Sequence, residues 1–422
     1  MSKTTEKVRK TLARRYRAER RFKAFGIVSI VIGLSALLLL FGDIIGKGHS
    51  AFFEHYVELS ITYDPETLEI EDANDPEQLR YGNFEGVVRA AIQERFPRVE
   101  ERQDRRALNA LLSTSAGYEL RDRLEADPSL LGQKETLWLQ LDDDADMFLK
   151  GSEKQRENAR LSPQQREWVL DLEAAGETRS EFNRSLFTSG DSREPEQAGI
   201  LGAILGSVFT MLVTLALSFP IGIAAAIYLE EFAPKNRFTD FIEVNINNLA
   251  AVPSIIFGLL GLAIFLSWFG MPRSVPLVGG IVLTLMTLPT VIISSRAAIK
   301  AVPPSIREAA MGLGASKMQV VLHHVLPLAM PGMLTGAIIG MAQALGETAP
   351  LLMIGMVAFI VELPTGPLSA ATVLPVQIFL WAGSPEQSFV ALTSAAIMVL
   401  LAFLIAMNTL AVVLRKRLER RW

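Results

Sequence analysis

Long apolar runs separated by charged segments constrain this chain more than any other feature. Half of the 422 residues are hydrophobic and 20% are charged, and the two classes occupy different stretches. About twenty consecutive apolar residues cross the hydrocarbon core of a bilayer. Runs of this kind lie at 25–45, 199–229, 245–269, 276–298, 327–346 and 389–414. The chain is therefore predicted to be an all-α polytopic membrane protein with six transmembrane helices.

The two chain ends indicate which side of the membrane they occupy. Residues 1–24 carry ten Lys or Arg against two Glu, directly before the apolar run 25–45. Because Lys and Arg accumulate on the cytoplasmic side of spans, we expect a cytoplasmic tail followed by a transmembrane anchor. A cleaved signal peptide is the alternative, but no small-residue cleavage site follows Leu40. The basic residues of 415–422 predict a second cytoplasmic tail.

A polar block at 46–198 interrupts the apolar pattern. It contains 33 acidic and 19 basic residues, and a segment of this length crosses a membrane largely regardless of its charge. Strand-like alternation and helix-start capping boxes both occur in it. The strands are expected at Tyr56–Thr62 and Thr136–Leu141, and the capping boxes at Ser162 with Gln165 and at Thr178 with Glu181. The block is predicted to be an inserted extracytoplasmic α+β domain.

Metal and catalytic chemistry find little support in the sequence. The chain has no cysteine and four histidines. Asp142, Asp143, Asp144 and Asp146 lack the glycine and the distal glutamate of a calcium loop, so a solvated acidic turn is expected. No phosphate-binding loop for ATP is present. We therefore predict no metal site and no catalytic residue.

Two further features concern packing in the membrane. Ala349–Val361 is too short to span and is flanked by prolines, so a re-entrant or interfacial segment is expected. Glycines recur every fourth residue at Gly332, Gly336 and Gly340, and at Gly202 and Gly206. Such faces let helices approach closely, either within the subunit or against a second one.

The loop at 299–327, between two predicted spans, carries the most informative pattern. Pro303 and Pro304 end the preceding helix. Ser305 with Glu308 is typical of a capping box that starts a new one. A short helix is therefore expected to project from the membrane, although a plain connecting loop is the alternative.

That short helix is predicted to end in a sharp turn. Gly312 and Gly314 interrupt it and permit backbone conformations that other residues avoid. A second helix is expected from Ala315 to His324. Leu326 and Pro327 then mark the start of the next span.

This spacing resembles the EAA loop of ABC-importer permeases. In that family the loop docks on a separate ATPase subunit and transmits its nucleotide-driven motion. The matching residues are Glu308, Ala309, Ala310, Gly314, Leu326 and Pro327, and with Gly312 they are the expected ATPase-coupling residues. His324 stands where the family has a branched aliphatic residue. The resemblance implies the permease core of an ABC type I importer.

Three more stretches resemble one branch, the PstA-type phosphate permeases. They are Ala224–Glu231, Val252–Gly261 and Gly346–Leu352, and Leu374–Gln377 also fits. The resemblance covers 199–414, which is the expected permease core. It implies a multi-pass protein of the bacterial inner membrane. The 46–198 block resembles an N-terminal extension of some bacterial members.

A phosphate oxyanion needs arginine, hydroxyl or backbone N–H donors, and polar residues within spans are usually functional. The candidates for the substrate pathway are Arg296, Ser294, Ser295, Gln343, Glu347 and Thr348. An equal alternative for Arg296 is a topology anchor that reaches the headgroups. The family often has an arginine in place of Gln343. Glu347 would repel phosphate, so a structural or gating role is expected for it.

The resemblance implies a transmembrane subunit without enzymatic activity of its own. Its expected partners are a PstC-type second permease, a PstB-type ATPase that binds ATP and Mg²⁺, and a PstS-type phosphate-binding protein. No cofactor on this chain and no nucleic acid partner are expected, because anionic lipid explains the basic tails. Alternatives are a permease for sulfate, molybdate or another small solute, and a membrane-anchored sensor with 46–198 as its receptor domain.

Overall fold

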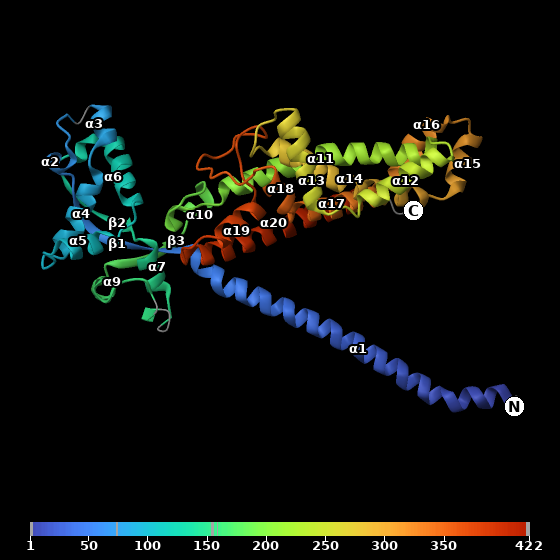
Figure 1. Ribbon diagram of the computed structural model, residues 1–422, viewed down its shortest axis with the longest axis horizontal. Helices are drawn as coiled ribbons and strands as arrows, with labels where there is room; N and C mark the ends of the chain where they lie inside the picture. The colour runs from blue at the N-terminus through green and yellow to red at the C-terminus, as the bar shows by residue number, and fades with distance from the viewer. Residues whose placement is uncertain (1–2, 73–74, 153–155, 158, 419–422) are drawn as a thin grey trace.

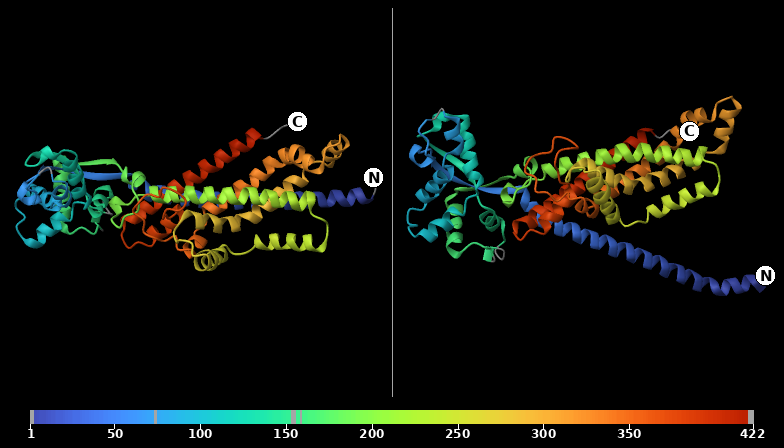
Figure 2. Two further views of the ribbon diagram at one scale, coloured as in Figure 1. Left: turned by 90° about the horizontal axis from the view of Figure 1, so that it is seen from above. Right: turned by 45° about the horizontal axis from the view of Figure 1, so that its top comes forward.

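The computed structural model describes residues 3–72, 75–152, 156–157 and 159–418. Figure 1 shows three parts: a long first helix, a small domain at one end of the molecule, and an elongated helical bundle. Both chain ends lie toward the end opposite the domain (Figures 1 and 2). The predicted tail at 415–422 lies outside the described residues from 419 onward.

The first helix, α1, runs from Lys3 to Gly48. Its 46 residues extend about 69 Å at 1.5 Å each, more than the roughly 30 Å of a bilayer core. The basic tail and the anchor predicted within it therefore form one uninterrupted helix. Its apolar stretch is exposed, and it diverges from the bundle (Figure 1). The two meet where Gly48 packs against the backbone of Ala395 in α20 (Ser388–Leu418).

The inserted domain is built on a three-stranded antiparallel sheet in the order β2-β1-β3. The strands are β1 (Phe53–Thr62), β2 (Lys134–Gln140) and β3 (Thr178–Phe182). Alternate residues Val57, Leu59 and Ile61 of β1 are buried, as the two-residue period of a strand requires. The two strands expected from the sequence are confirmed, and the inserted region has the α+β composition predicted for it.

Short helices pack on this sheet and enclose one apolar core. Helical segments of the domain are η1 (His49–Phe52), α2 (Pro65–Leu68), α3 (Pro76–Tyr81), α4 (Phe84–Arg95), α5 (Arg102–Asn109), α6 (Ser115–Ala126), η2 (Pro128–Leu130), α7 (Asp143–Lys150), α9 (Pro163–Ala175), α10 (Ser185–Thr188) and η3 (Pro195–Gln197). The capping box of Ser162 and Gln165 at the start of α9 is confirmed. The one predicted at Thr178 is wrong, because that segment pairs with β1 as a strand and satisfies its backbone groups there.

The bundle follows from residue 201 onward. Its helical segments are α11 (Leu201–Ile227), η4 (Tyr228–Phe232), α12 (Arg237–Leu249), α13 (Ser254–Gly261), η5 (Leu262–Trp268), α14 (Pro276–Lys300), α15 (Pro304–Gly312), α16 (Lys317–Val320), η6 (Val321–Val325), α17 (Leu326–Leu345), α18 (Ala349–Met353), α19 (Leu374–Ala382) and α20. Within the described residues, five helices are long and apolar enough to cross a membrane, or up to six if a bent pair counts as one span. The all-α membrane fold is confirmed.

The span expected at 245–269 is wrong as a single helix. Instead α12 and the α13–η5 segment are bent by 101° at a short break. Pro253 accounts for the break, because it has no N–H for a helical hydrogen bond and it disfavours helical geometry at Val252. The chain resumes as a helix at Ser254, directly after this proline.

The separate helix expected from Ala315 to His324 is also wrong in its end. The helix begins at Lys317 and runs without interruption to Leu345. It passes Pro327 through the π-helical turn η6 (Val321–Val325). The wider hydrogen-bonding pattern of a π turn accommodates a proline that lacks an N–H. The projecting loop is therefore rigidly continuous with α17.

The glycine faces serve packing within the chain. Gly332, Gly336 and Gly340 lie against Ala298, Ser294 and Thr287 of α14, so that a side chain at any of the three would meet that helix. Gly206 likewise lies against the backbone of Thr372. Of the two alternatives open for these glycines, the structure shows the contact inside the subunit.

Candidate functional site

The predicted EAA loop forms a compact turn between α15 and α16. Gly314 adopts a φ of +90°, a conformation that glycine reaches without a steric penalty. The turn is closed by hydrogen bonds from Gly314 N–H to the Met311 carbonyl, 2.9 Å, and from Ala315 N–H to the Ala310 carbonyl, 3.1 Å. Ser316 and Gln319 form a capping box that starts α16.

The capping box predicted at Ser305 and Glu308 is wrong. The helix α15 begins at Pro304, with Pro303 as its N-cap, and no side chain caps it. Proline suits the first helical position, since its missing N–H would have no partner there. The Glu308 side chain therefore makes no capping hydrogen bond at the start of α15, and it is exposed.

The loop has an exposed face and a packed face. Glu308, Ala309, Gly312 and Gly314 are exposed, and Leu313 between the glycines is 91% exposed. Met311 and Met318 on either side of it are also exposed, so the loop presents several large apolar side chains to solvent.

The packed face rests on an apolar cluster beneath the loop. Ala310 is buried in this cluster, and Leu326 packs against it. Pro327 is half-buried at the start of α17. The remaining buried members are Ala226, Ile299, Val302, Val320, Val325, Ala329 and Met333, which come from α11, α14, α16, α17 and the segments that join them. The loop is thereby seated on the ends of three long helices.

Ion pairs surround this base. Arg307, directly before Glu308, donates to Glu231 through Nε at 3.1 Å and Nη2 at 2.8 Å. Its Nη1 and Nη2 also donate to the carbonyls of Val302 and Ile299, at 2.6 and 2.9 Å. The last carbonyls of a helix have no partner inside it, so Arg307 satisfies groups at the end of α14.

Arg296, the principal candidate for contact with substrate, is occupied by carboxylates. Its Nε lies 2.5 Å from Glu230 and its Nη2 lies 2.5 Å from Glu243, while Lys300 approaches Glu230 at 3.3 Å. Arg296 is 8% exposed. The charge of Arg296 is therefore already balanced within the chain by two carboxylates.

The two serines beside Arg296 have other surroundings. Ser294 donates its hydroxyl to the Thr290 carbonyl at 2.7 Å and faces the position of Gly336. The hydroxyl of Ser295 is buried and has no hydrogen-bond partner among the described residues. Neither serine makes a hydrogen bond with Arg296 in the described part of the chain.

The remaining pathway candidates lie elsewhere. Gln343 is exposed near the end of α17, and Glu347 and Thr348 are half-buried just beyond it. Gly336 packs against Ser294, and Gln343 lies seven residues further along the same helix, roughly 10 Å at 1.5 Å per residue. The structure therefore splits the candidates into one group near the α15 end and another toward the domain end.

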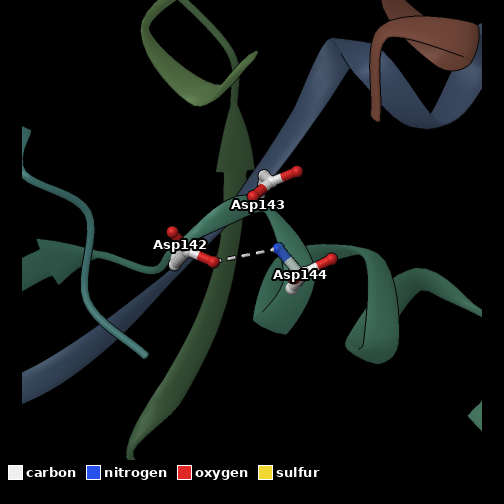
Figure 3. A group of neighbouring side chains, drawn as sticks. All are labelled: Asp142, Asp143 and Asp144. Carbon is white, nitrogen blue, oxygen red and sulfur yellow. Dashed lines mark hydrogen bonds between the residues drawn. The ribbon is translucent and has the colours of Figure 1, made fainter. Parts of the chain in front are cut away.

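The acidic segment of the inserted domain is a helix start. Asp142, Asp143 and Asp144 offer carboxylate oxygens that all lie within 4.8 Å of one another. Figure 3 shows the three side chains and the hydrogen bond between Asp142 and Asp144. Asp142 caps α7 by accepting from Asp144 N–H, and Asp143 accepts from the Ser388 hydroxyl at 2.7 Å.

All three carboxylates are half-buried, so the expectation of a solvated turn is wrong. Burial, with the charges of Asp143 and Glu196, raises the pKa of Asp142. The segment ties the domain to the first turn of α20. Negative charge at a helix N-terminus is favourable in itself.

Sequence reasoning missed the acidic partners. Glu230 and Glu231 were noted for their resemblance to a family stretch, and Glu243 was not singled out. Two adjacent carboxylates at the end of an apolar run were the available indication, because charges near a membrane span are usually paired.

Comparison with known proteins identifies the family. The profile described as "Binding-protein-dependent transport system inner membrane component" matches residues 218–422. The phosphate transport system permease protein PstA of Haemophilus influenzae is 31% identical over 224 residues, which cover 53% of this chain and 78% of that protein. The chain belongs to the PstA-type permeases of ABC importers.

Other comparisons place limits on this assignment. The probable ABC transporter permease protein YqgI of Bacillus subtilis is 31% identical over 173 residues, 41% of this permease, and the match spans 58% of that relative's length. A structure of the MetNI methionine ABC transporter has 17% sequence identity and a TM-score of 0.42, covering 52% of this permease and 96% of that chain. A likeness at that TM-score carries no part of the assignment.

The inserted domain has a match of its own. A profile described as a domain of unknown function, DUF3333, matches residues 9–159. That range contains α1 from Arg9 onward and the domain as far as the segment after α7. The permease thus joins two regions that different profiles recognise.

Proposed function

We propose that this permease imports inorganic phosphate across the bacterial inner membrane. The observation that carries the proposal is the relation to the phosphate transport system permease protein of Haemophilus influenzae over most of that protein's length. The stretches that resemble PstA-type permeases fall within the same half of the chain. The channel itself would form with a second, PstC-type permease.

The α15 end of the bundle is the proposed cytoplasmic end. The α15–α16 loop and both chain ends lie opposite the inserted domain (Figure 1). The basic residues of 1–24 and of Arg415–Arg417 belong to those chain ends, and basic residues accumulate on the cytoplasmic side. The inserted domain would then be extracytoplasmic, with both termini in the cytoplasm.

The α15–α16 loop is the proposed docking surface for a separate ATPase. The exposed face formed by Glu308, Ala309, Leu313 and Gly314 is available to a partner, and the packed face is joined to the bundle. ATP and Mg²⁺ would bind to that PstB-type subunit, and this chain would hold no cofactor. A PstS-type phosphate-binding protein would deliver substrate from the domain side.

The proposed substrate pathway starts from Gln343, Glu347 and Thr348 near the domain end of α17. We assign Arg296 to the alternative role of an anchor, because Glu230 and Glu243 already balance its charge and the residue is buried. Ser294 and Ser295, which lie beside this anchor, would then act in helix packing.

Uptake of radiolabelled phosphate in a strain that lacks this chain tests the proposal. Restoring the chain should restore uptake, and excess unlabelled phosphate should compete while excess sulfate should not. Competition by sulfate or molybdate, with no effect of phosphate, would instead assign the permease to that other oxyanion. Unchanged uptake of phosphate, sulfate and molybdate in the strain that lacks the chain would contradict the proposal.

A further inference from the structure

The end of α11 contacts three other elements through three consecutive residues. The π-helical turn η4 extends α11 and holds Glu230, Glu231 and Phe232. Glu230 pairs with Arg296 of α14, Glu231 pairs with Arg307 of α15, and the ring of Phe232 lies 5.2 Å from the Lys317 ammonium of α16. We call Tyr228–Phe232 the junction turn. Such π-helical turns occur frequently at functional positions.

Arg307 is the member of α15 that reaches this turn. It is adjacent to Glu308, yet the two side chains have different surroundings: Arg307 is 20% exposed in its side chain and Glu308 is exposed. Successive residues of an α-helix lie about 100° apart around its axis. One helix can therefore present Glu308 to a partner and Arg307 to the bundle.

The contacts of Arg307 join three elements at one guanidinium. Its donors reach the Glu231 carboxylate on the junction turn and the Ile299 and Val302 carbonyls at the end of α14. Because the guanidinium is planar and rigid, simultaneous contacts of this kind fix the orientation of the side chain. The Glu231 side chain is 10% exposed, so water has little access to weaken the pair.

We propose that Arg307 and Glu231 are a positioning pair that fixes the docking helix α15 to the ends of α11 and α14. Displacement of α15 by a partner is then passed to both long helices as one body. The apolar cluster under the loop holds α15 against the bundle through non-directional contacts. The hydrogen bonds of the ion pair are directional, so the pair sets the angle of α15. The role of this pair in transport rests on the proposed function, whereas the attachment of α15 to α11 and α14 does not depend on which substrate is carried.

The first test measures how strongly the ion pair restrains α15. Amide hydrogen exchange across α15 is compared in the full chain, reconstituted in lipid nanodiscs, for the wild type, Glu231→Gln, Arg307→Gln, and the double variant. Each single substitution should speed exchange in α15 at least tenfold while the domain helix α4 is unchanged. The double variant should be no faster than Arg307→Gln alone, because once Arg307 is lost Glu231 has no partner left to lose and the effects of a coupled pair do not add.

A matched control uses Lys235→Gln. Lys235 is an exposed cation between the junction turn and α12, and it forms no ion pair among the described residues. This variant should leave exchange in α15 unchanged. Unchanged exchange in the Glu231 and Arg307 variants, or effects that add in the double variant, would overturn the positioning pair whatever the permease carries.

The second test concerns coupling in the assembled importer. Complexes purified through this chain should contain the ATPase in wild-type amounts for all variants, and phosphate transported per ATP hydrolysed should fall at least tenfold for either Gln variant. Arg307→Lys should restore part of the ratio of phosphate transported to ATP hydrolysed, because lysine keeps the positive charge but lacks the planar set of N–H donors of the guanidinium. A wild-type complex that transports no phosphate would refute the proposed cargo and leave the exchange result standing, whereas normal coupling ratios in both Gln variants would refute the pair's role.

Discussion

Replacement of Gly314 by valine isolates the contribution of one backbone angle to coupling. The φ of +90° at Gly314 is unfavourable for a β-branched residue, because its Cβ crowds the neighbouring backbone. A Cβ there would lie more than 4 Å from every atom apart from those of its chain neighbours, so it would not collide with the rest of the molecule. Any effect of Gly314→Val therefore arises from the turn geometry.

The magnitude follows from that conformational cost. A left-handed conformation costs an L-residue about 1–2 kcal/mol. One to two kcal/mol corresponds to a roughly 5- to 30-fold change in an equilibrium population. The native turn between α15 and α16 should therefore be depopulated by that factor, and the exposed face of α15 would be presented at the wrong angle.

Gly312→Val is the matched control for this experiment. Gly312 closes α15 in a helical conformation, and it too has open space around the position of a Cβ. Both variants add the same side chain to the exposed loop, and only one of them requires a positive φ. Phosphate uptake should fall about 5- to 30-fold for Gly314→Val and much less for Gly312→Val, at equal membrane levels. Equal uptake by the two variants would refute the role of the turn.

Further predictions concern the domain, its pH response and the bundle. Residues 50–195 expressed alone should give a cooperative thermal transition by circular dichroism, because the domain has its own apolar core. Burial beside Asp146 and Glu196 raises the pKa of Glu54 from 4.5 to about 8, so the folded state favours the protonated form. The stability that Glu54 contributes is present below about pH 4.5 and is lost as pH rises toward 8. The free energy of unfolding of the detergent-solubilised permease should fall over that range, and Glu54→Gln should flatten the slope. Arg296→Lys should lower the free energy of unfolding by about 1–3 kcal/mol, because lysine cannot keep hydrogen bonds to both Glu230 and Glu243 in the same geometry. Phosphate uptake per molecule of folded protein in the membrane should stay at the wild-type rate.

The sequence was sufficient where a single physical rule governs a segment. Apolar length predicted the long spans α11, α14 and α20, because nothing but their composition decides whether they cross a membrane. The positive φ of Gly314 follows from a glycine after a helix end. The capping box at Ser162 formed because its serine, proline and glutamine all satisfy local groups.

Prediction was less accurate where two rules compete within a few residues. Thr178 with Glu181 fits a capping box, yet the open edge of β1 recruits the segment as a strand. Pro253 breaks an apolar run that hydropathy alone treats as continuous, whereas Pro327 does not, because a π turn precedes it. Only the three-dimensional structure distinguishes the two prolines.

Of the candidate site, only the exposed face of the α15–α16 loop could be predicted from the sequence. Glu308, Ala309 and Gly314 belong to a spacing that is visible in the chain, whereas the partners of Arg296 and Arg307 lie roughly 50 to 75 positions away along the sequence, where no spacing rule applies. Tertiary ion pairs between such distant residues depend on how α11, α12 and α14 pack. The role of Arg296 therefore stayed open at the sequence level.

ATP-driven phosphate accumulation in proteoliposomes is the most direct test of phosphate import by this permease. The complex purified through a tag on this permease is reconstituted with the phosphate-binding protein on the domain side and with ATP and Mg²⁺ on the α15 side. We expect accumulation of labelled phosphate that requires ATP and is not reduced by excess sulfate. ATP hydrolysis without phosphate accumulation, or accumulation of sulfate in its place, would contradict it.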